Sequence, residues 1–182
     1  MRHALAIFAI LLALSAGPAG HAAETRLDDL FRRLAQTHDP AEGDRIARAI
    51  WDVWNRAPDE VTGDLMDRGQ SALYDLDTDT ALAAFNAVVE REPHYAEGWN
   101  KRATVYYVIG NFDASIADIA RVLQIEPRHF GALAGLGMAY DALNDRRMAL
   151  RAYRAALQIN PYLDDVRERA DTLEREILAG QI

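Results

Sequence analysis

The five histidines are the first candidates for chemistry, because an imidazole binds metals and transfers protons near neutral pH. They are spread along the chain, as His3, His21, His38, His94 and His129. No two of them have the spacing that places a pair of metal ligands on one helix face, and no HExxH motif occurs. We therefore expect no metal site, and we expect His94 and His129 to be solvated residues in turns that follow Pro93 and Pro127.

Residues for nucleophilic or acid–base catalysis do not form a recognisable motif either. None of the three serines has the surroundings of a nucleophile elbow, and no glycine-rich phosphate loop is present. The acidic pairs Asp28-Asp29 and Asp164-Asp165 lie at predicted helix starts, where negative charge offsets the helix dipole. The sequence thus predicts a protein that is not an enzyme and holds no cofactor.

The amino-acid composition excludes several classes of site and of binding partner for this chain. The chain has no cysteine, which excludes disulfides and zinc–thiolate sites. Half of its 182 residues are hydrophobic and 26% are charged, as in a folded soluble protein. The formal net charge is -8, so the surface should repel phosphate backbones and anionic lipid heads. We therefore expect no nucleic acid partner.

Residues 1–23 have the pattern of a secretory signal peptide. A basic start at Arg2 is followed by the apolar run 4–14, which is shorter than the roughly 20 residues needed to span a bilayer. Small residues at Gly20 and Ala22 suit a signal peptidase, so the mature chain should begin near Ala23. An uncleaved anchor and a hydrophobic first helix are the alternatives. With an arginine-rich composition typical of GC-rich genomes, the chain is predicted to be periplasmic in a Gram-negative bacterium, or secreted.

An internal repeat organises the rest of the chain. Pro93, Pro127 and Pro161 are each 34 residues apart, and aligning them superimposes the blocks 62–95, 96–129 and 130–163. Small residues recur at positions eight and twenty of each block, and large ones at positions four and twenty-four. A turn signal near the middle divides each block into two helices, which can cross closely at the small residues while the large ones fill the space beside them. The pattern predicts three stacked helix hairpins.

The block 96–129 (AEGWNKRATVYYVIGNFDASIADIARVLQIEPRH) resembles the tetratricopeptide repeat (TPR) nearly position for position, and 130–163 is almost as similar. The block 62–95 departs from the family at Arg68, where Leu is usual, and at Ala72, where Tyr is usual. The resemblance implies an all-α fold, a TPR solenoid of about three and a half to four helix-turn-helix repeats with a C-terminal capping helix.

The two ends of the repeat region are predicted to be helical as well. Residues 24–61 are interpreted as a degenerate TPR-like helix pair, with Trp51 and Trp54 packing between this pair and the first clear repeat. Residues 164–182 are predicted to form the capping helix, whose single apolar stripe covers the last repeat and which stops at Gly180.

In TPR proteins the first helix of each pair lines a concave groove that binds extended peptides or partner helices. The family's groove positions carry over to a mixed surface, in which Met and Tyr suit adaptable contact. The predicted site residues are Met66, Gln70, Leu73, Tyr74, Glu97, Asn100, Thr104, Tyr107, Ala134, Met138 and Asp141. Lys101 is the one cation at the positions where the family clamps a peptide carboxylate, so no such clamp is expected.

The third repeat has only small or absent side chains at several of its groove positions. Gly131, Ala134 and Gly135 leave room for a partner's side chain, although glycine there could equally be tolerated drift at a weakly specified position. Gly137 is expected to serve the helix crossing.

These features favour a non-enzymatic, monomeric interaction module that binds a peptide or partner protein in the groove, in the bacterial cell envelope. The alternative is a structural or assembly subunit that self-associates, or joins a membrane complex, through its convex face or end helices. No membrane insertion is expected after signal cleavage.

Overall fold

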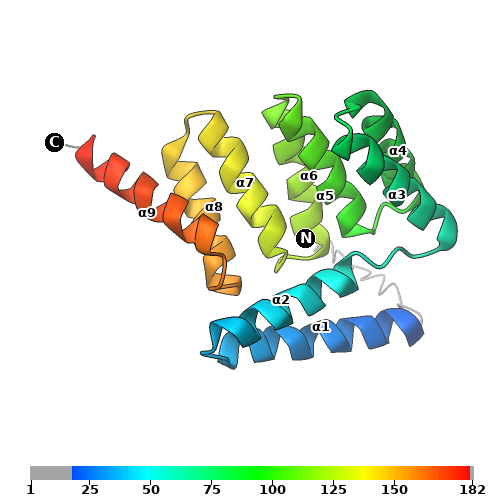
Figure 1. The fold of residues 1–182 in the computed structure, drawn as a ribbon, viewed down its shortest axis with the longest axis horizontal. Coiled ribbons are helices and arrows are strands. Elements are labelled where there is room, and N and C mark those ends of the chain that lie inside the picture. The colour runs from blue at the N-terminus through cyan, green and yellow to red at the C-terminus, as the bar shows by residue number, and fades with distance from the viewer. Residues whose placement is uncertain (1–17, 181–182) are drawn as a thin grey trace, which may run out of the picture.

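A computed structural model describes residues 18–180, and within that range the chain forms nine helices and no strand (Figure 1). Most of the predicted leader therefore lies outside the described residues. The helices are α1 (Pro18–Gln36), α2 (Pro40–Trp54), α3 (Glu60–Tyr74), α4 (Thr78–Arg91), α5 (Ala96–Val108), α6 (Phe112–Ile125), α7 (Phe130–Ala142), α8 (Arg146–Ile159) and α9 (Asp164–Ala179). The predicted all-α solenoid of helix hairpins is confirmed.

Three hairpins, α3–α4, α5–α6 and α7–α8, stack side by side. The small residue at position eight is required in two of them by close approach. A Cβ added to Gly69 would lie 2.7 Å from the ring of Phe85, and one added to Gly137 would lie 2.5 Å from the ring of Tyr153. The helices of a pair could not cross at this distance with a larger residue there.

The turn inside each hairpin has the same two features. The residue at position fifteen has a positive φ, and the next residue caps the second helix with a side-chain oxygen. The residues with positive φ are Leu76, Gly110 and Asn144, and the caps are Asp77, Asn111 and Asp145. Leu76 is the unusual member, because a left-handed conformation costs roughly 1–2 kcal/mol for a residue that has a Cβ and lacks the short polar side chain with which asparagine tolerates it.

Position seven of a repeat contacts the preceding hairpin. Arg102 donates to Asn86 of α4 at 2.8 Å, and Leu136 packs on a cluster that includes Val122 of α6. The corresponding residue of the first repeat, Arg68, is exposed. Its exposure follows from the position of α1 and α2, which do not stack on the outer side of α3–α4.

The α1–α2 hairpin lies instead across one edge of the stack, beneath the turns that join successive repeats (Figure 1). Tyr95 donates a hydrogen bond to the carbonyl of Asn55 at 3.1 Å, and Tyr162 donates one to the carbonyl of Thr37 at 2.7 Å. Both tyrosines come from turns between repeats, which therefore form the platform for the hairpin.

Aromatic side chains fill the contact between the hairpin and this platform. Trp54 stacks on His129 with 4.0 Å between the ring centroids and 7° between the planes, and it also contacts Phe130 and Trp51. The sequence-based prediction that Trp51 and Trp54 pack against the first repeat is therefore wrong. They pack at the start of α7, because the hairpin crosses the turns rather than extending the stack.

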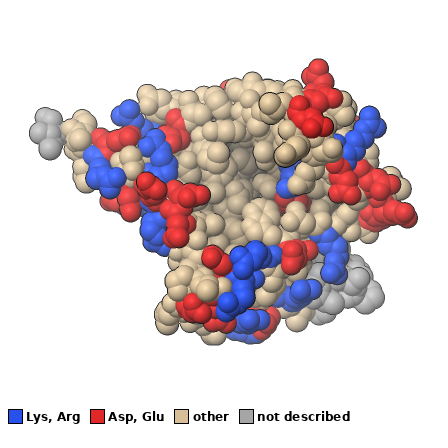
Figure 2. Space-filling model, in the orientation of Figure 1, with Lys and Arg blue, Asp and Glu red and all other residues tan. Residues whose placement is uncertain are grey.

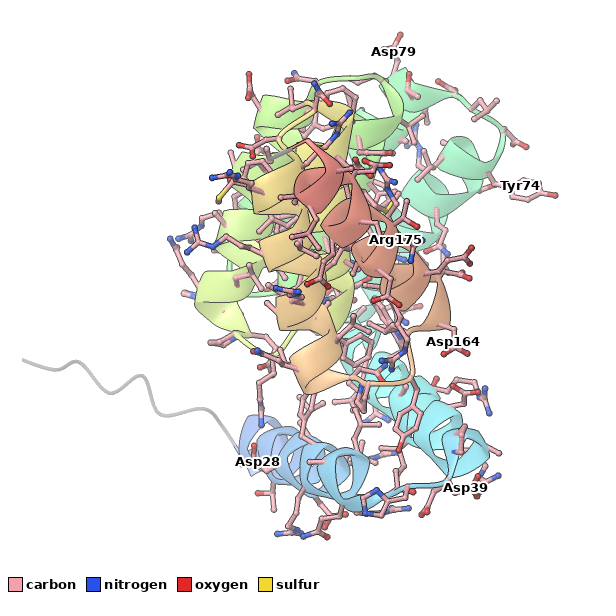
Figure 3. The ribbon with its side chains drawn as sticks, turned by 90° about the vertical axis from the view of Figure 1, so that its left-hand side faces the viewer. Asp28, Asp39, Tyr74, Asp79, Asp164 and Arg175 are labelled. Atoms are coloured by element: carbon pink, nitrogen blue, oxygen red, sulfur yellow. The ribbon has the colours of Figure 1, made fainter. Side chains whose placement is uncertain are left out.

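At the other end, α9 continues the stack by packing on α8. Leu173 is fully buried and Ala170 nearly so, in a cluster with Leu150 and Tyr153. Figure 3 views the molecule from this end, with α9 running over the last repeat and the α1–α2 hairpin below it. The predicted capping helix is confirmed, and Gly180 is its C-cap residue.

Candidate functional site

A pocket lies between α5 and α7, on the face formed by α3, α5 and α7. It has a volume of about 290 Å³. Figure 2 shows this hollow in the middle of the face, surrounded by uncharged surface. Its floor and walls are largely apolar, with polar groups at one side. The residues that line it include Trp51, Lys101, Tyr107, Ile119, Gly135 and Met138.

Five of the eleven predicted groove residues line this pocket, namely Asn100, Thr104, Tyr107, Ala134 and Met138. Gln70 and Tyr74 line a separate depression on α3. Tyr74 is 89% exposed and points away from the helices (Figure 3). Whether these residues bind a partner stays a prediction.

The remaining predicted residues are held by contacts within the chain. Met66 is buried in the cluster of the first repeat, and Leu73 packs against that cluster. Glu97 is buried among polar partners, and Asp141 forms an ion pair with Arg169 of α9. These four side chains contribute to the groove's support rather than to its free surface.

Glu97 and His129 form a buried polar pair beneath the hairpin. The Nδ1 atom of His129 accepts a hydrogen bond from the backbone N–H of Ala132 at 3.0 Å, so it caps α7 and carries no proton. The proton therefore sits on Nε2, which donates to the Glu97 carboxylate at 3.1 Å. Asn100 and Lys101 also contact this carboxylate, at 3.1 and 3.4 Å. With these partners the buried charge is satisfied.

The expectation of a solvated turn histidine holds for His94, which is exposed, but it is wrong for His129, which is fully buried. His129 is buried because its ring is both a helix cap and the stacking partner of Trp54. The stacking role is not visible in the repeat pattern, because it depends on where the hairpin lies. The cap is a local contact with the backbone of Ala132.

The three glycines of α7 have different environments. A Cβ on Gly131 would lie 2.5 Å from the ring of Trp51, so the hairpin requires glycine there, just as Tyr153 requires it at Gly137. A Cβ on Gly135 would meet only Cδ1 of Ile119, at the ordinary contact distance of 3.6 Å. Gly135 therefore costs the helix about 1 kcal/mol relative to alanine without a packing requirement.

Trp51 is one of the pocket residues that the sequence did not predict, and it lies outside the repeats. It comes from α2, so the hairpin contributes one wall of the pocket in addition to covering the edge. The family's groove positions cannot reveal it, because they describe the repeats alone.

Charge is unevenly distributed around the pocket. Acidic side chains gather over α3, whereas basic and acidic side chains are mixed along α2 (Figure 2). Asp64 and Asp67 of α3 are exposed, and no ion pair of either is found in the described part of the chain. On the α9 side, the hydrogen bond from Arg169 to Asp141 raises the pKa of the guanidinium further above its ordinary value.

Within residues 18–180, no group of three His, Asp or Glu side chains is arranged to hold a metal ion. No helix in the same range has the length and apolar character to cross a membrane. The ring of Tyr153 lies against Gly137. Burial raises the pKa of Tyr153 to about 12, so its hydroxyl stays protonated.

Known proteins share this architecture. A family model described as tetratricopeptide repeat matches residues 130–162. The chain is 36% identical over 155 residues to a TPR repeat-containing protein of Rhizobium etli, and the match covers 85% of this chain and 76% of that protein. A shorter match, 29% identical, is to the protein bimA of Emericella nidulans and covers 51% of this chain and 12% of that protein.

Solved structures give the same fold at low sequence identity. The TPR domain of Sgt2 from Aspergillus fumigatus superimposes with a TM-score of 0.65 at 20% identity, over 69% of this chain and 84% of that one. The first TPR domain of Spaghetti (RPAP3), bound to the HSP90 peptide SRMEEVD, superimposes with a TM-score of 0.62 at 16% identity, over 64% and 93% of the two chains.

Proposed function

Because the chain belongs to the tetratricopeptide-repeat family, we propose that it is a non-enzymatic interaction module that binds a peptide or partner protein in its concave groove. The observation that carries the proposal is the pocket between α5 and α7, where exposed or half-buried Tyr107 and Met138 flank a largely apolar hollow. Burial of such side chains is a main source of binding free energy at protein interfaces.

We also propose that the protein works in the bacterial cell envelope. The proposal is based on the leader pattern of residues 1–23. Cleavage after Ala22 would remove Pro18–Ala22 from the start of α1. Mass spectrometry of envelope-fraction protein should give a chain that begins near Ala23, and a chain that retains Met1 would contradict cleavage.

Affinity capture from envelope extract tests the groove. Wild-type protein is compared with the double variant Tyr107→Ala, Met138→Ala, and the matched control is Val108→Ala, Leu143→Ala. The control residues are 47% and 45% exposed but do not line the pocket. The pocket variant should lose a partner that the control variant retains. If all three versions recover the same partners, the groove assignment is wrong.

The alternative function is assembly through the convex face or the end helices. Sedimentation analysis of the full chain, with and without residues 164–182, distinguishes the two. An oligomer that is lost on truncation would favour assembly, whereas a monomer that captures its partner through the pocket favours the groove.

A further inference from the structure

The turns inside the three clear hairpins form one edge of the molecule. They lie along the upper edge in Figure 1, opposite the α1–α2 hairpin. Each turn exposes one large apolar side chain, and these are Leu76, Ile109 and Leu143. None of the three lines the pocket between α5 and α7. We call this surface, made of residues 75–79, 109–113 and 143–147, the turn edge.

Leu76 is the residue of the turn edge that folding explains least. Its φ is 60°, and its side chain is 74% exposed. Gly110 and Asn144 hold the equivalent position in the other two turns, and both residue types tolerate a left-handed backbone better than leucine does. Because Leu76 is exposed, burial within the chain does not offset this backbone cost. Its side chain is therefore available for contact with another molecule.

The charge of the turn edge changes along its length. Residues 75–79 contain three aspartates and no cation, residues 109–113 contain one aspartate, and residues 143–147 contain two arginines and one aspartate. The formal charges of the three segments are therefore -3, -1 and +1. Asp79 lies at the top of Figure 3 and points away from the helices. Neither Asp79 nor Arg147 has an ion pair within residues 18–180, whereas Arg146 pairs with Glu176 of α9 at 3.4 Å.

This change in charge determines how a second copy of the chain can approach the edge. If two copies aligned their edges in the same direction, the two acidic segments 75–79 would face each other and repel. A two-fold axis through the middle turn reverses one copy, so that segment 75–79 of each copy faces segment 143–147 of the other and the charges attract. The arrangement also brings Leu76 of each copy to Leu143 of the other, and Ile109 to its own counterpart beside the axis. Asp113 near the axis is exposed, so salt screens its repulsion.

We propose that the turn edge is the interface of a two-fold symmetric homodimer, in which the acidic turn of each copy contacts the basic turn of the other. The inference goes beyond the proposed function, because the groove pocket stays open on another face. It replaces the monomer that the sequence predicted. Contact limited to three turns makes a small interface, so we expect a dissociation constant on the order of 10 μM.

Sedimentation velocity of the purified protein in dilute salt, at concentrations above and below this value, tests the interface. The wild type should dimerise, and added salt should weaken the dimer. Asp79→Arg and Arg147→Asp, made separately, should each weaken the dimer about 10-fold or more, because each places like charges together at both ends of the interface. The matched controls are Asp171→Arg and Arg48→Asp, which reverse exposed charges outside the turn edge that have no ion pair among the described residues. Both controls should dimerise as the wild type does.

An equimolar mixture of Asp79→Arg and Arg147→Asp gives the sharpest test. In a mixed dimer, the introduced arginine at position 79 of one chain faces the introduced aspartate at position 147 of the other, and the second end keeps its wild-type pair. The mixture should therefore dimerise about as tightly as the wild type, although neither variant does so alone. This recovery requires that the two positions face each other across a two-fold axis.

Leu76→Asn separates the contact from folding. Asparagine tolerates the left-handed backbone, so the melting temperature, measured below the dissociation constant, should rise by about 2–4 °C. The dimer should nevertheless weaken about 10-fold or more, because an apolar side chain is lost from both ends of the interface. A variant that is destabilised and still dimerises as the wild type does would contradict this role for Leu76.

A wild type that stays monomeric at every concentration would overturn the inference. So would turn-edge variants that dimerise as the wild type does, or a mixture that fails to recover the dimer. Capture of a partner through Tyr107 and Met138 does not depend on these outcomes, because no turn-edge residue lines the pocket. If the dimer is absent and capture persists, the proposed function stands and only the interface fails.

Discussion

The α1–α2 hairpin and α9 both lie outside the three clear repeats, yet they are attached in opposite ways. Helix α9 adds to the stack and covers the last apolar face, as the next repeat would. The hairpin crosses the turns at one edge and is held by aromatic rings and by the hydroxyls of two tyrosines. Helix α9, which continues the stack, covers its open end. The α1–α2 hairpin, which does not continue the stack, contributes Trp51 to one wall of the groove pocket.

The largest effect is expected at the hairpin contact. Trp54→Ala removes a buried ring that stacks on His129, and it should cost about 3–5 kcal/mol of unfolding free energy. Urea denaturation followed by circular dichroism measures the loss. Trp54→Phe is the control, because it keeps an aromatic ring and removes an indole N–H that is buried without a hydrogen-bond partner. Equal losses for the two variants would mean that the aromatic contact does not hold the hairpin.

A smaller loss is expected at the cap. Leu173→Ala truncates a fully buried side chain between α9 and α8, at the end of the stack where the surroundings can relax. We expect a loss of about 2–3 kcal/mol in the same denaturation experiment. Cleavage by trypsin should then increase within α9, while the pocket's affinity for peptides is retained. Loss of affinity in this variant would remove the distinction between a closing helix and a groove-building one.

The ion pair in α5, which lies beneath the hairpin, should also differ from the one that ties α9 to α7. Lys101→Met leaves the buried Glu97 carboxylate without its cation and should cost about 1–2 kcal/mol, an effect that largely disappears when Glu97→Gln is also present. Arg169→Met breaks a pair whose side chains are 37% and 21% exposed, so it should cost less than about 1 kcal/mol. A double-mutant cycle for each pair measures the coupling. Equal coupling energies would show that burial does not separate the two contacts.

The smallest effect concerns pH. The hydrogen bond from Arg91, followed by that from the Thr62 backbone, lowers the pKa of Asp59 from 3.8 to about 2. Since the folded pKa is depressed, the stabilisation is present above pH 3.8 and is lost as the pH falls through about 2. The melting temperature of the wild type should exceed that of Asp59→Asn at pH 5, and the difference should vanish near pH 2.

The linker before α9 provides the contrast. In this linker the side chain of Asn160 accepts a hydrogen bond from the backbone N–H of Tyr162, and it has no charge to titrate. Substitution of Asn160 should therefore give a loss that does not change between pH 5 and about pH 2 beyond the wild type's own trend. A loss that varied with pH as the Asp59 effect does would contradict this account.

Repeat periodicity predicted the helices, because they depend on local sequence and on the repeated spacing. The 34-residue spacing gave the three hairpins, and the apolar stripe of 164–179 gave α9, because side chains three and four apart share a helix face. The position of the α1–α2 hairpin was not predicted, because it depends on contacts between residues such as Trp54 and His129 that are distant in the chain. Arginine at position seven, as in Arg68, is no signal of this, because Arg102 occupies the same position and still contacts the preceding hairpin.

Only part of the candidate groove was predicted from the sequence. Family positions identified Tyr107 and Met138, whose exposure depends on the repeat alone. They also identified Glu97, but its buried carboxylate already accepts a hydrogen bond from His129, the N-cap residue of α7. Trp51 was missed because it belongs to no repeat.

The exposed Arg68 has a consequence for how copies of this protein can associate. Open-ended filaments of solenoids require an apolar first face that can accept the last face of another copy. The outer side of α3 presents a guanidinium at the position where such a joint would form, and α9 occupies the last face. A joint at this face would therefore have to accommodate Arg68, as α4 accommodates Arg102 through Asn86, while α9 leaves no bare repeat face at the other end.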